Sequence, residues 1–279
     1  MLIAGLMFAI MNVFVKMVPN IPAIEVVLFR SIVSFTITLG YLKYLKIPVF
    51  GDQKFLLISR GLAGAISLSI YFYTLQNIPL ASAVTMQFLS PIFTSILGIY
   101  LVKERVYSWQ WFFYLLAFGG LLMIQGFDPR VSPTMLVLGI IASFFAGLAY
   151  TLIRKINKKE HPLVIVFYFP LVTTPLAAIY CYFNWVTPIG NEWYVLILIG
   201  VLTQIAQYFM TKSYQEEDIS KVASIKYLSV VYAVGFGYVF FQETFPLEVF
   251  LGMFLIILGV VANIIYKTNK SKADKNLQK

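Results

Sequence analysis

Long apolar runs separated by short polar gaps constrain this chain more than any other feature of its sequence. A helix needs about 20 apolar residues to cross the hydrocarbon core of a bilayer. Proline, glycine and charged residues divide the chain into runs of about that length. The predicted helices cover residues 1–17, 22–42, 55–76, 80–102, 108–125, 133–153, 162–183, 192–211, 219–241 and 247–266. The sequence therefore predicts an all-α membrane protein with ten transmembrane helices.

The overall composition supports a membrane protein and argues against other classes. Hydrophobic residues make up 60% of the chain and charged residues 12%, which lies outside the range of soluble globular domains. The net charge of +9 comes from Lys and Arg in the gaps and the tail, so we expect no nucleic-acid partner. Residues 1–17 lack a basic leader and a small-residue cleavage site, which favours a first transmembrane helix over a signal peptide.

The cations alternate between gaps, and this alternation predicts the topology. Lys and Arg are retained on the cytoplasmic side of a membrane, and the intervening gaps hold only Lys16 and Arg130. The cation-rich gaps contain Lys43, Lys46 and Lys54; Lys103 and Arg105; Arg154, Lys155, Lys158 and Lys159; Lys212; and Lys267, Lys270, Lys272, Lys275 and Lys279. Both termini are thus predicted to be cytoplasmic, with residues 267–279 as a basic, disordered cytoplasmic tail.

The second half of the chain repeats the plan of the first at an offset of about 139 residues. The offset pairs Leu89-Ser90 with Leu228-Ser229, Gly98 with Gly237, Glu104 with Glu243, Leu116 with Leu255 and Gly120 with Gly259. Five helices per copy is an odd number, so the second copy enters the membrane upside down. We therefore predict two inverted five-helix repeats, residues 1–126 and 127–266, with a substrate site between them near the midplane.

Lys226 is the most informative single residue of the predicted spans. It lies about eight residues past Asp218, or roughly 12 Å along a helix. A charge at that depth is costly unless it faces protein or a wet cavity. Its ammonium either meets a carboxylate, phosphate or carbonyl of a substrate, or the side chain snorkels towards the cytoplasm or forms a structural pair.

Gln87 is the repeat mate of Lys226, and each is followed by an aromatic residue, Phe88 and Tyr227. Two polar and aromatic pairs facing one cavity suit an amphipathic solute with a flat apolar part. We therefore include these four residues in a candidate substrate-binding set.

Two arginines also fall within predicted spans. Arg30 lies about eight residues past Pro22, at a depth in its span comparable to that of Lys226. It either binds an anionic group or holds two helices together. Arg60 lies close to Lys54, so we predict an interfacial anchor, with a basic cytoplasmic vestibule as the alternative.

Further polar residues complete the candidate pathway. Asn12 and Gln207 are placed with the substrate-binding set, although hydrogen bonds between helices explain them equally well. Pro91 removes an intrahelical hydrogen bond near the middle of its run. It therefore marks either a flexible point of a gate or a static kink.

No residue pattern points to an enzyme. The single histidine, His161, adjoins Pro162 in a gap, and the single cysteine, Cys181, lies inside an apolar run. No nucleophile–histidine–carboxylate set, metal-ligand cluster or phosphate loop is present in the sequence. We expect no cofactor and no resident metal.

The sequence resembles a known family along nearly its whole length. The motifs that carry the resemblance are Phe29-Arg30, Ser59-Arg60-Gly61, the segment from Tyr71 to Ala83, Ser90-Pro91-Ile92-Phe93 and Lys103-Glu104-Arg105. They look like the EamA branch of the drug/metabolite transporter superfamily. The resemblance implies a bacterial inner-membrane carrier of small metabolites such as amino acids or nucleoside-like compounds, S-adenosylmethionine among them.

The resemblance also implies moving parts. The third and fourth helices, and the eighth and ninth, are expected to act as gating hairpins around a central cavity. Val230 stands where the repeat would place a second proline matching Pro91, so the gate is not expected to be symmetric. Glu104 and Glu243 match the family's glutamate after each fourth helix, and we predict that each favours the N-terminus of the helix that follows.

These observations lead to one main hypothesis and one alternative. The main hypothesis is a secondary transporter, an exporter or exchanger, that moves a small amphipathic metabolite by alternating access. The alternative is a membrane scaffold or lipid-handling protein whose polar residues only pack helices. The expected partners are a small-molecule substrate and the lipid bilayer, and the sequence defines no oligomeric state.

Overall fold

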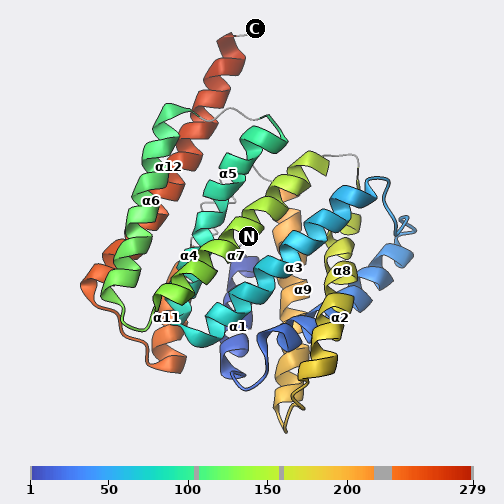
Figure 1. Cartoon of the computed structure of the whole chain (residues 1–279). Helices are drawn as coiled ribbons and strands as arrows, with labels where there is room; N and C mark the ends of the chain where they lie inside the picture. The colour runs from blue at the N-terminus through green and yellow to red at the C-terminus, as the bar shows by residue number, and fades with distance from the viewer. Residues whose placement is uncertain (1, 104–106, 157–159, 217–227, 278–279) are drawn as a thin grey trace.

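A computed structural model describes residues 2–103, 107–156, 160–216 and 228–277, and within these residues the secondary structure is helical, without strands (Figure 1). The elements are α1 (Leu2–Met17), α2 (Ala23–Tyr44), α3 (Lys54–Asn77), α4 (Leu80–Met86), the 3-10 turn η1 (Gln87–Leu89), α5 (Ser90–Leu101), α6 (Ser108–Phe127), α7 (Pro133–Ile156), α8 (Pro162–Asn184), α9 (Glu192–Glu216), α11 (Leu228–Phe241) and α12 (Leu247–Leu277).

The helices follow the apolar runs closely, and the all-α prediction is confirmed for the described part of the chain. Seven helical segments are long and apolar enough to cross a membrane, with α4, η1 and α5 counted as one segment. Shorter apolar helices cover Leu2–Met17, Ser108–Ile124 and Ser229–Phe241. The chain is thus a multi-pass membrane protein. In such an environment helices satisfy every backbone polar group internally, which an open strand cannot do.

Prolines set several helix starts. Pro22 and Pro79 directly precede α2 and α4, and Pro133 and Pro162 open α7 and α8. Proline suits the first helical turn because its missing amide hydrogen would be unpaired there and its φ angle is already helical. The sequence signals used to place the breaks therefore coincide with the observed ends.

Two details differ from the sequence predictions. The run predicted as one helix over 80–102 is divided by the 3-10 turn η1. α5 begins directly after η1, at Ser90, and Pro91 lies in its first turn. The prediction of a disordered tail is wrong for residues 267–277, because α12 continues to Leu277. The added turns contain Lys, Ala, Asn and Ser and no Gly or Pro, so nothing in the segment stops the helix.

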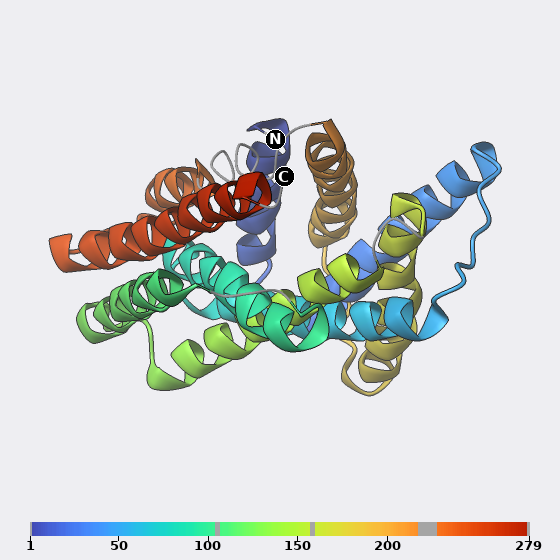
Figure 2. The ribbon, with the colours of Figure 1, turned by 90° about the horizontal axis from the view of Figure 1, so that it is seen from above.

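The helix pairs with the most extensive contacts join the two halves of the sequence. α6 packs along α12 at one edge of the molecule, and α2 packs along α8 near the opposite edge (Figures 1 and 2). Between these pairs, α3 packs on α7 and α8, and α9 packs on α1 and α2. The two halves are therefore interleaved rather than lying as separate bodies.

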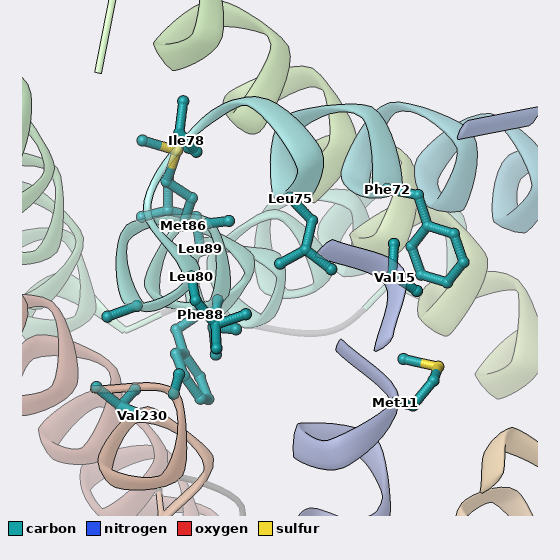
Figure 3. Packing of buried hydrophobic residues seen from close by; sticks show 14 of the residues in the cluster. Met11, Val15, Phe72, Leu75, Ile78, Leu80, Met86, Phe88, Leu89 and Val230 are labelled. Carbon is teal, nitrogen blue, oxygen red and sulfur yellow. The ribbon is translucent and has the colours of Figure 1, made fainter. Parts of the chain in front are cut away.

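The main apolar core lies where α1, α3, α4 and α11 approach one another (Figure 3). Phe72, Leu75 and Leu80 are fully buried there, and Val15 is buried from the side of α1. Burying one such side chain contributes roughly 1.5–3 kcal/mol in water. Inside a bilayer that gain is absent, so close packing rather than expulsion of water must hold these helices together.

Glycines permit the closest contact, between α6 and α12. A Cβ atom at Gly120 would lie 2.5 Å from the carbonyl oxygen of Gly252, and one at Gly259 would lie 2.7 Å from that of Phe113. Backbones this close leave no room for a side chain. The two contacts fix the register of α6 against α12.

We expect Gly120→Leu to separate α6 from α12 and to lower the stability by about 1–3 kcal/mol or more, as overpacking does in a close-packed core. The apparent melting temperature of the purified protein in detergent measures this effect. Gly119→Leu is the matched control, because a Cβ there meets nothing within 4 Å. Equal melting of the two variants would contradict the packing described here.

Candidate functional site

A small polar cavity lies between α2, α3, α8 and α9, inside the apolar body of the protein. Its volume is about 30 Å³. The lining residues are Arg30, Ser34, Arg60, Val166, Phe169, Pro170, Thr203, Gln204 and Gln207. Two of these four helices come from each half of the sequence, so neither half forms the cavity alone.

Arg30 is anchored on one side of this cavity. Its side chain is buried, and its Nε donates a hydrogen bond of 3.1 Å to the Thr203 hydroxyl of α9. The Thr203 hydroxyl in turn lies 3.0 Å from the sulfur of Met11 on α1. The guanidinium carbon lies 5.2 Å from the ring centre of Phe169, in range of a cation–π contact. Arg30 is thereby oriented by α8 and α9.

Arg60 reaches the same aromatic ring from α3. Its guanidinium carbon lies 5.5 Å from the ring centre of Phe169, and its Nε and Nη1 are buried without a hydrogen-bond partner. Arg60 therefore packs against α8 beside Arg30, and its predicted role as an interfacial anchor stays a prediction.

The cavity is strongly cationic. Arg30 Nη1 is also buried without a partner, and the two guanidinium groups oppose each other electrostatically. The ion pairs of the described residues lie elsewhere, at Lys16–Glu243 and Arg130–Asp128. Within the described part of the chain, neither cavity arginine has a carboxylate within ion-pair distance. The arrangement is suited to holding an anion.

Several residues predicted from the sequence lie in or beside this cavity. Gln207 lines it together with Arg30. Asn12 is buried on α1, next to Met11, and its side chain is hydrogen-bonded to that of Tyr71. Gln204, which also lines the cavity, has a buried Oε1 atom without a partner. The structure thus groups Arg30, Gln204 and Gln207 around one cavity, whereas Asn12 is buried against Tyr71 with its Oδ1 unpaired.

The remaining candidates fall elsewhere. Gln87 and Phe88 lie on η1, and Phe88 is buried in the main apolar core beside Val230 of α11 (Figure 3). Pro91 lies in the first turn of α5. Lys226 and Tyr227 lie outside the described residues. Their predicted roles remain predictions.

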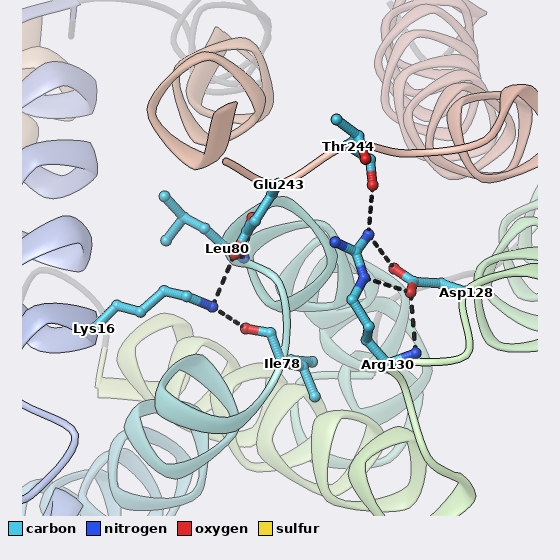
Figure 4. Close-up of polar contacts among 7 residues, drawn as sticks. All are labelled: Lys16, Ile78, Leu80, Asp128, Arg130, Glu243 and Thr244. Atoms are coloured by element: carbon cyan, nitrogen blue, oxygen red, sulfur yellow. Dashed lines mark hydrogen bonds and ion pairs between the residues drawn. The ribbon is translucent and has the colours of Figure 1, made fainter. Parts of the chain in front are cut away.

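A second polar cluster joins the end of α1 to the start of α4 and to the α11–α12 connection (Figure 4). Lys16 forms an ion pair of 2.9 Å with Glu243 and donates a hydrogen bond to the Ile78 carbonyl. The Glu243 carboxylate also accepts the backbone N–H of Leu80, at 2.9 Å from Oε2. This cluster cannot be found from the sequence, because no local pattern brings residues 16, 80 and 243 together.

The predicted role of Glu243 is corrected by this geometry. The sequence predicts that Glu243 favours the N-terminus of the helix that follows it, α12. Its carboxylate instead accepts the backbone N–H of Leu80, the first residue of α4. Gln242 has a φ of 53°, and this turn directs Glu243 back towards Gly237, whose carbonyl accepts the Glu243 N–H. The Glu243 carboxylate thus lies at the positive N-terminal end of α4, a helix of the other half of the chain, rather than at that of α12.

A neighbouring contact reinforces this end of the molecule. Arg130 of the α6–α7 connection pairs with Asp128 at 2.8 Å and donates to the Thr244 carbonyl at 2.7 Å (Figure 4). Its guanidinium carbon lies 4.8 Å from the Phe245 ring centre. The α11–α12 connection is therefore held from two sides.

The fold and the cavity define a multi-pass helical membrane protein with a polar cavity built by helices from both halves of its chain. The sequence matches the EamA-like transporter family over residues 1–126 and again over residues 133–265. The chain belongs to the EamA family of the drug/metabolite transporter superfamily.

Named relatives are transporters. The chain is 29% identical over 263 residues to the pseudopaline exporter of Pseudomonas aeruginosa strain UCBPP-PA14, covering 93% of each chain. It is 27% identical over 254 residues to the S-adenosylmethionine uptake transporter of Rickettsia prowazekii, covering 90% of this chain and 86% of the relative.

A solved structure shows the same fold. This structure, described as "Crystal structure of protein", superposes with a TM-score of 0.64 over 95% of this chain and 98% of its own, at 18% sequence identity. At that identity the likeness concerns the fold alone.

We expect Glu243→Gln to lower the apparent melting temperature, because it leaves the partly buried Lys16 ammonium without a counter-charge. Removing one partner of a buried ion pair typically costs about 3–5 kcal/mol. Glu248→Gln is the matched control, since Glu248 is exposed in the first turn of α12. Adding Lys16→Met to Glu243→Gln should recover part of the loss, and a double variant no more stable than the single one would argue against coupling.

Proposed function

We propose that this protein is a secondary transporter that exports or exchanges a small amphipathic metabolite, such as an amino acid or nucleoside-like compound, by alternating access. In this proposal ten transmembrane helices form two inverted repeats, residues 1–126 and 127–266, followed by a basic cytoplasmic tail. The protein lies in the bacterial inner membrane with both termini in the cytoplasm. The observation that carries the proposal is the match of one transporter family to both halves.

The helix contacts support the two repeats. In the two repeats α3 corresponds to α9, α7 to α1 and α8 to α2. The contacts of α3 with α7 and α8 therefore correspond to those of α9 with α1 and α2. The close approach of Gly120 to Gly252 becomes that of Gly259 to Phe113. A pattern that maps onto itself in this way is expected of repeats related by a pseudo-two-fold axis.

The backbone supports the same correspondence. Lys103 and Gln242 have φ angles of 58° and 53°, which non-glycine residues adopt uncommonly. Each directly precedes, in the sequence, the glutamate that follows the fourth helix of its repeat. Lys46, after α2, has a similar φ of 55°, so the support comes from the equivalent positions of Lys103 and Gln242 in the two repeats rather than from the left-handed conformation alone.

The polar cluster around Glu243 fits the closed side of such a transporter. It ties α1, α4 and the α11–α12 connection together at one end of the molecule. In the predicted topology this is the outer end. Release of the Lys16–Glu243 pair, with bending at η1 and Pro91, would separate these elements and open a path from outside.

The substrate set proposed from the sequence is kept: Lys226, Gln87, Tyr227, Phe88, Arg30, Asn12 and Gln207, with Pro91 as a gating residue. The grouping of Arg30 and Gln207 around one cavity supports their part of this set. The two named relatives support a metabolite as cargo, but one is an exporter and the other an uptake transporter. Comparing efflux from loaded vesicles with uptake into empty ones therefore tests the direction of transport.

One observation favours the alternative of a lipid-handling protein. An apolar groove of about 590 Å³ runs between α3 and α8, lined by residues that include Ile58, Leu62 and Leu176. An acyl chain fits such a surface. A lipid-handling protein would use this groove and leave the arginine cavity without a transport role.

Flux in liposomes decides between the two functions. We expect the purified protein to exchange or move at least one radiolabelled solute from a panel of amino acids, nucleosides and S-adenosylmethionine across a sealed bilayer. Protein-free vesicles and vesicles with Glu243→Gln provide the comparison. Movement of fluorescent phospholipid between leaflets, with none of the panel transported, would replace the carrier by a lipid-handling protein.

Cysteine labelling tests the topology. In a Cys181→Ala background, we expect Asn77→Cys to react with a membrane-impermeant maleimide from outside intact cells. Asp52→Cys, also exposed but in a predicted cytoplasmic gap, should react only after the membrane is opened. The reverse pattern would invert the proposed orientation.

A further inference from the structure

We propose that Arg30 and Arg60 form a subsite for the carboxylate group of the transported solute. This inference rests on the proposed transport function, and it adds a chemical class of cargo: a solute that carries a carboxylate. It stands on the geometry of the cavity between α2, α3, α8 and α9.

The first step of the argument is the missing counter-charge. A cation within a membrane-spanning segment is costly and normally pairs with an anion or faces water. Here two guanidinium groups contact one ring, that of Phe169, at 5.2 and 5.5 Å. A cation–π contact offsets only part of the cost of two like charges brought together. An anion between them would remove the repulsion and supply the missing pairing.

The second step is the set of unused donors. Arg30 Nη1, Arg60 Nε and Arg60 Nη1 are all buried without an acceptor. A buried donor left unpaired costs about 1–3 kcal/mol, more when it is charged. Three such atoms in one small cavity are unusual in a native protein. A planar carboxylate offers two acceptor oxygens that match the fork of a guanidinium.

The third step is the fixed orientation of Arg30. Its Nε is held by Thr203, so the orphaned Nη1 cannot turn freely to find another acceptor. Glu25, the carboxylate nearest to Arg30 along α2, is instead engaged with the backbone N–H of Val186 at 3.1 Å. The donor is therefore presented to the cavity before any ligand arrives, which reduces the entropy lost on binding.

The fourth step is the size of the space. A cavity of about 30 Å³ corresponds to roughly one water molecule. It holds a carboxylate group but not a whole solute, so the remainder of the solute must extend beyond it. The lining also includes acceptors: Gln204 Oε1 has no partner, and Pro170 leaves the Val166 carbonyl without its usual donor. These positions suit hydrogen-bond donors next to the carboxylate.

Binding by matched probes tests the subsite without relying on flux. The protein is placed in phosphatidylcholine nanodiscs at constant chloride and ionic strength. Its melting temperature is followed against acetate, benzoate and phenylalanine, and against acetamide, benzamide and phenylalaninamide. We expect at least one carboxylate to raise the melting temperature saturably while its amide does not, because a ligand that binds the folded state stabilises it.

Arg60→Gln is the decisive variant. It removes a charge that opposes Arg30 and leaves no described carboxylate unpaired, and the lost contacts with Phe169 and Tyr150 are offset by relief of that repulsion, so the ligand-free protein should melt close to the wild type. The concentration of carboxylate needed for half of the stabilisation should rise at least tenfold, as expected when a buried charge pair is broken. Arg60→Lys should be intermediate, and Lys43→Gln, which removes an exposed cation, should behave like the wild type.

Several outcomes would overturn the proposal. One is equal stabilisation by each carboxylate and its amide. Another is an unchanged carboxylate response in Arg60→Gln, with a lower melting temperature of the ligand-free variant, which would make Arg60 structural. Stabilisation by chloride or inorganic phosphate alone would indicate an inorganic anion site. An Arg60-dependent rise in melting temperature in phosphatidylglycerol nanodiscs, with no carboxylate response, would indicate a lipid headgroup.

The binding measurement tests the subsite and the flux measurement tests the transport function, so either claim can be rejected without the other. Transport of a panel solute without carboxylate discrimination would keep the transporter and remove this subsite. Carboxylate binding that depends on Arg60, without flux of any panel compound, would keep the subsite and remove the proposed function.

Discussion

The structure depends on how charges are accommodated in a body that is almost entirely apolar. At Lys16 and Glu243 the accommodation is complete: the ammonium has a carboxylate and a carbonyl, and the carboxylate has the N-terminus of α4. At Arg30 and Arg60 it is incomplete, since three donor atoms have no acceptor. An unpaired charge is costly in a low-dielectric interior. The first cluster is therefore a closed contact, and the second lacks the acceptors that the proposed carboxylate would supply.

These two clusters are connected by the interleaving of the halves. The Glu243 cluster joins α1 and α4 to a connection in the other half, and the arginine cavity takes two helices from each half. A relative movement of the halves would therefore act on both places at once. This linkage gives a physical reason why opening one end and exposing a bound solute can be the same event, as alternating access requires.

Irregular helix segments lie where such a movement would need them. η1 interrupts the fourth span directly before Pro91, and α8 contains Pro170 and Pro175. Proline removes one intrahelical hydrogen bond and relaxes the helix locally. In contrast, α6 and α12 are locked together by glycine contacts between their backbones. The molecule thus combines a glycine-packed edge with a fourth span interrupted by η1 and a continuous α8 that carries two internal prolines.

The sequence by itself determined the helices, because apolar length and proline position depend on residues close together in the chain: the starts after Pro22 and Pro79 needed no tertiary information. It also indicated Arg30, Asn12 and Gln207, since a polar residue inside an apolar run stands out without any structure. Only the tertiary structure decided that Arg60 shares the ring of Phe169 with Arg30, and that Glu243 accepts from Leu80 rather than from α12. These contacts join residues more than 100 positions apart, and the packing of the two halves, rather than any local pattern, brings them together.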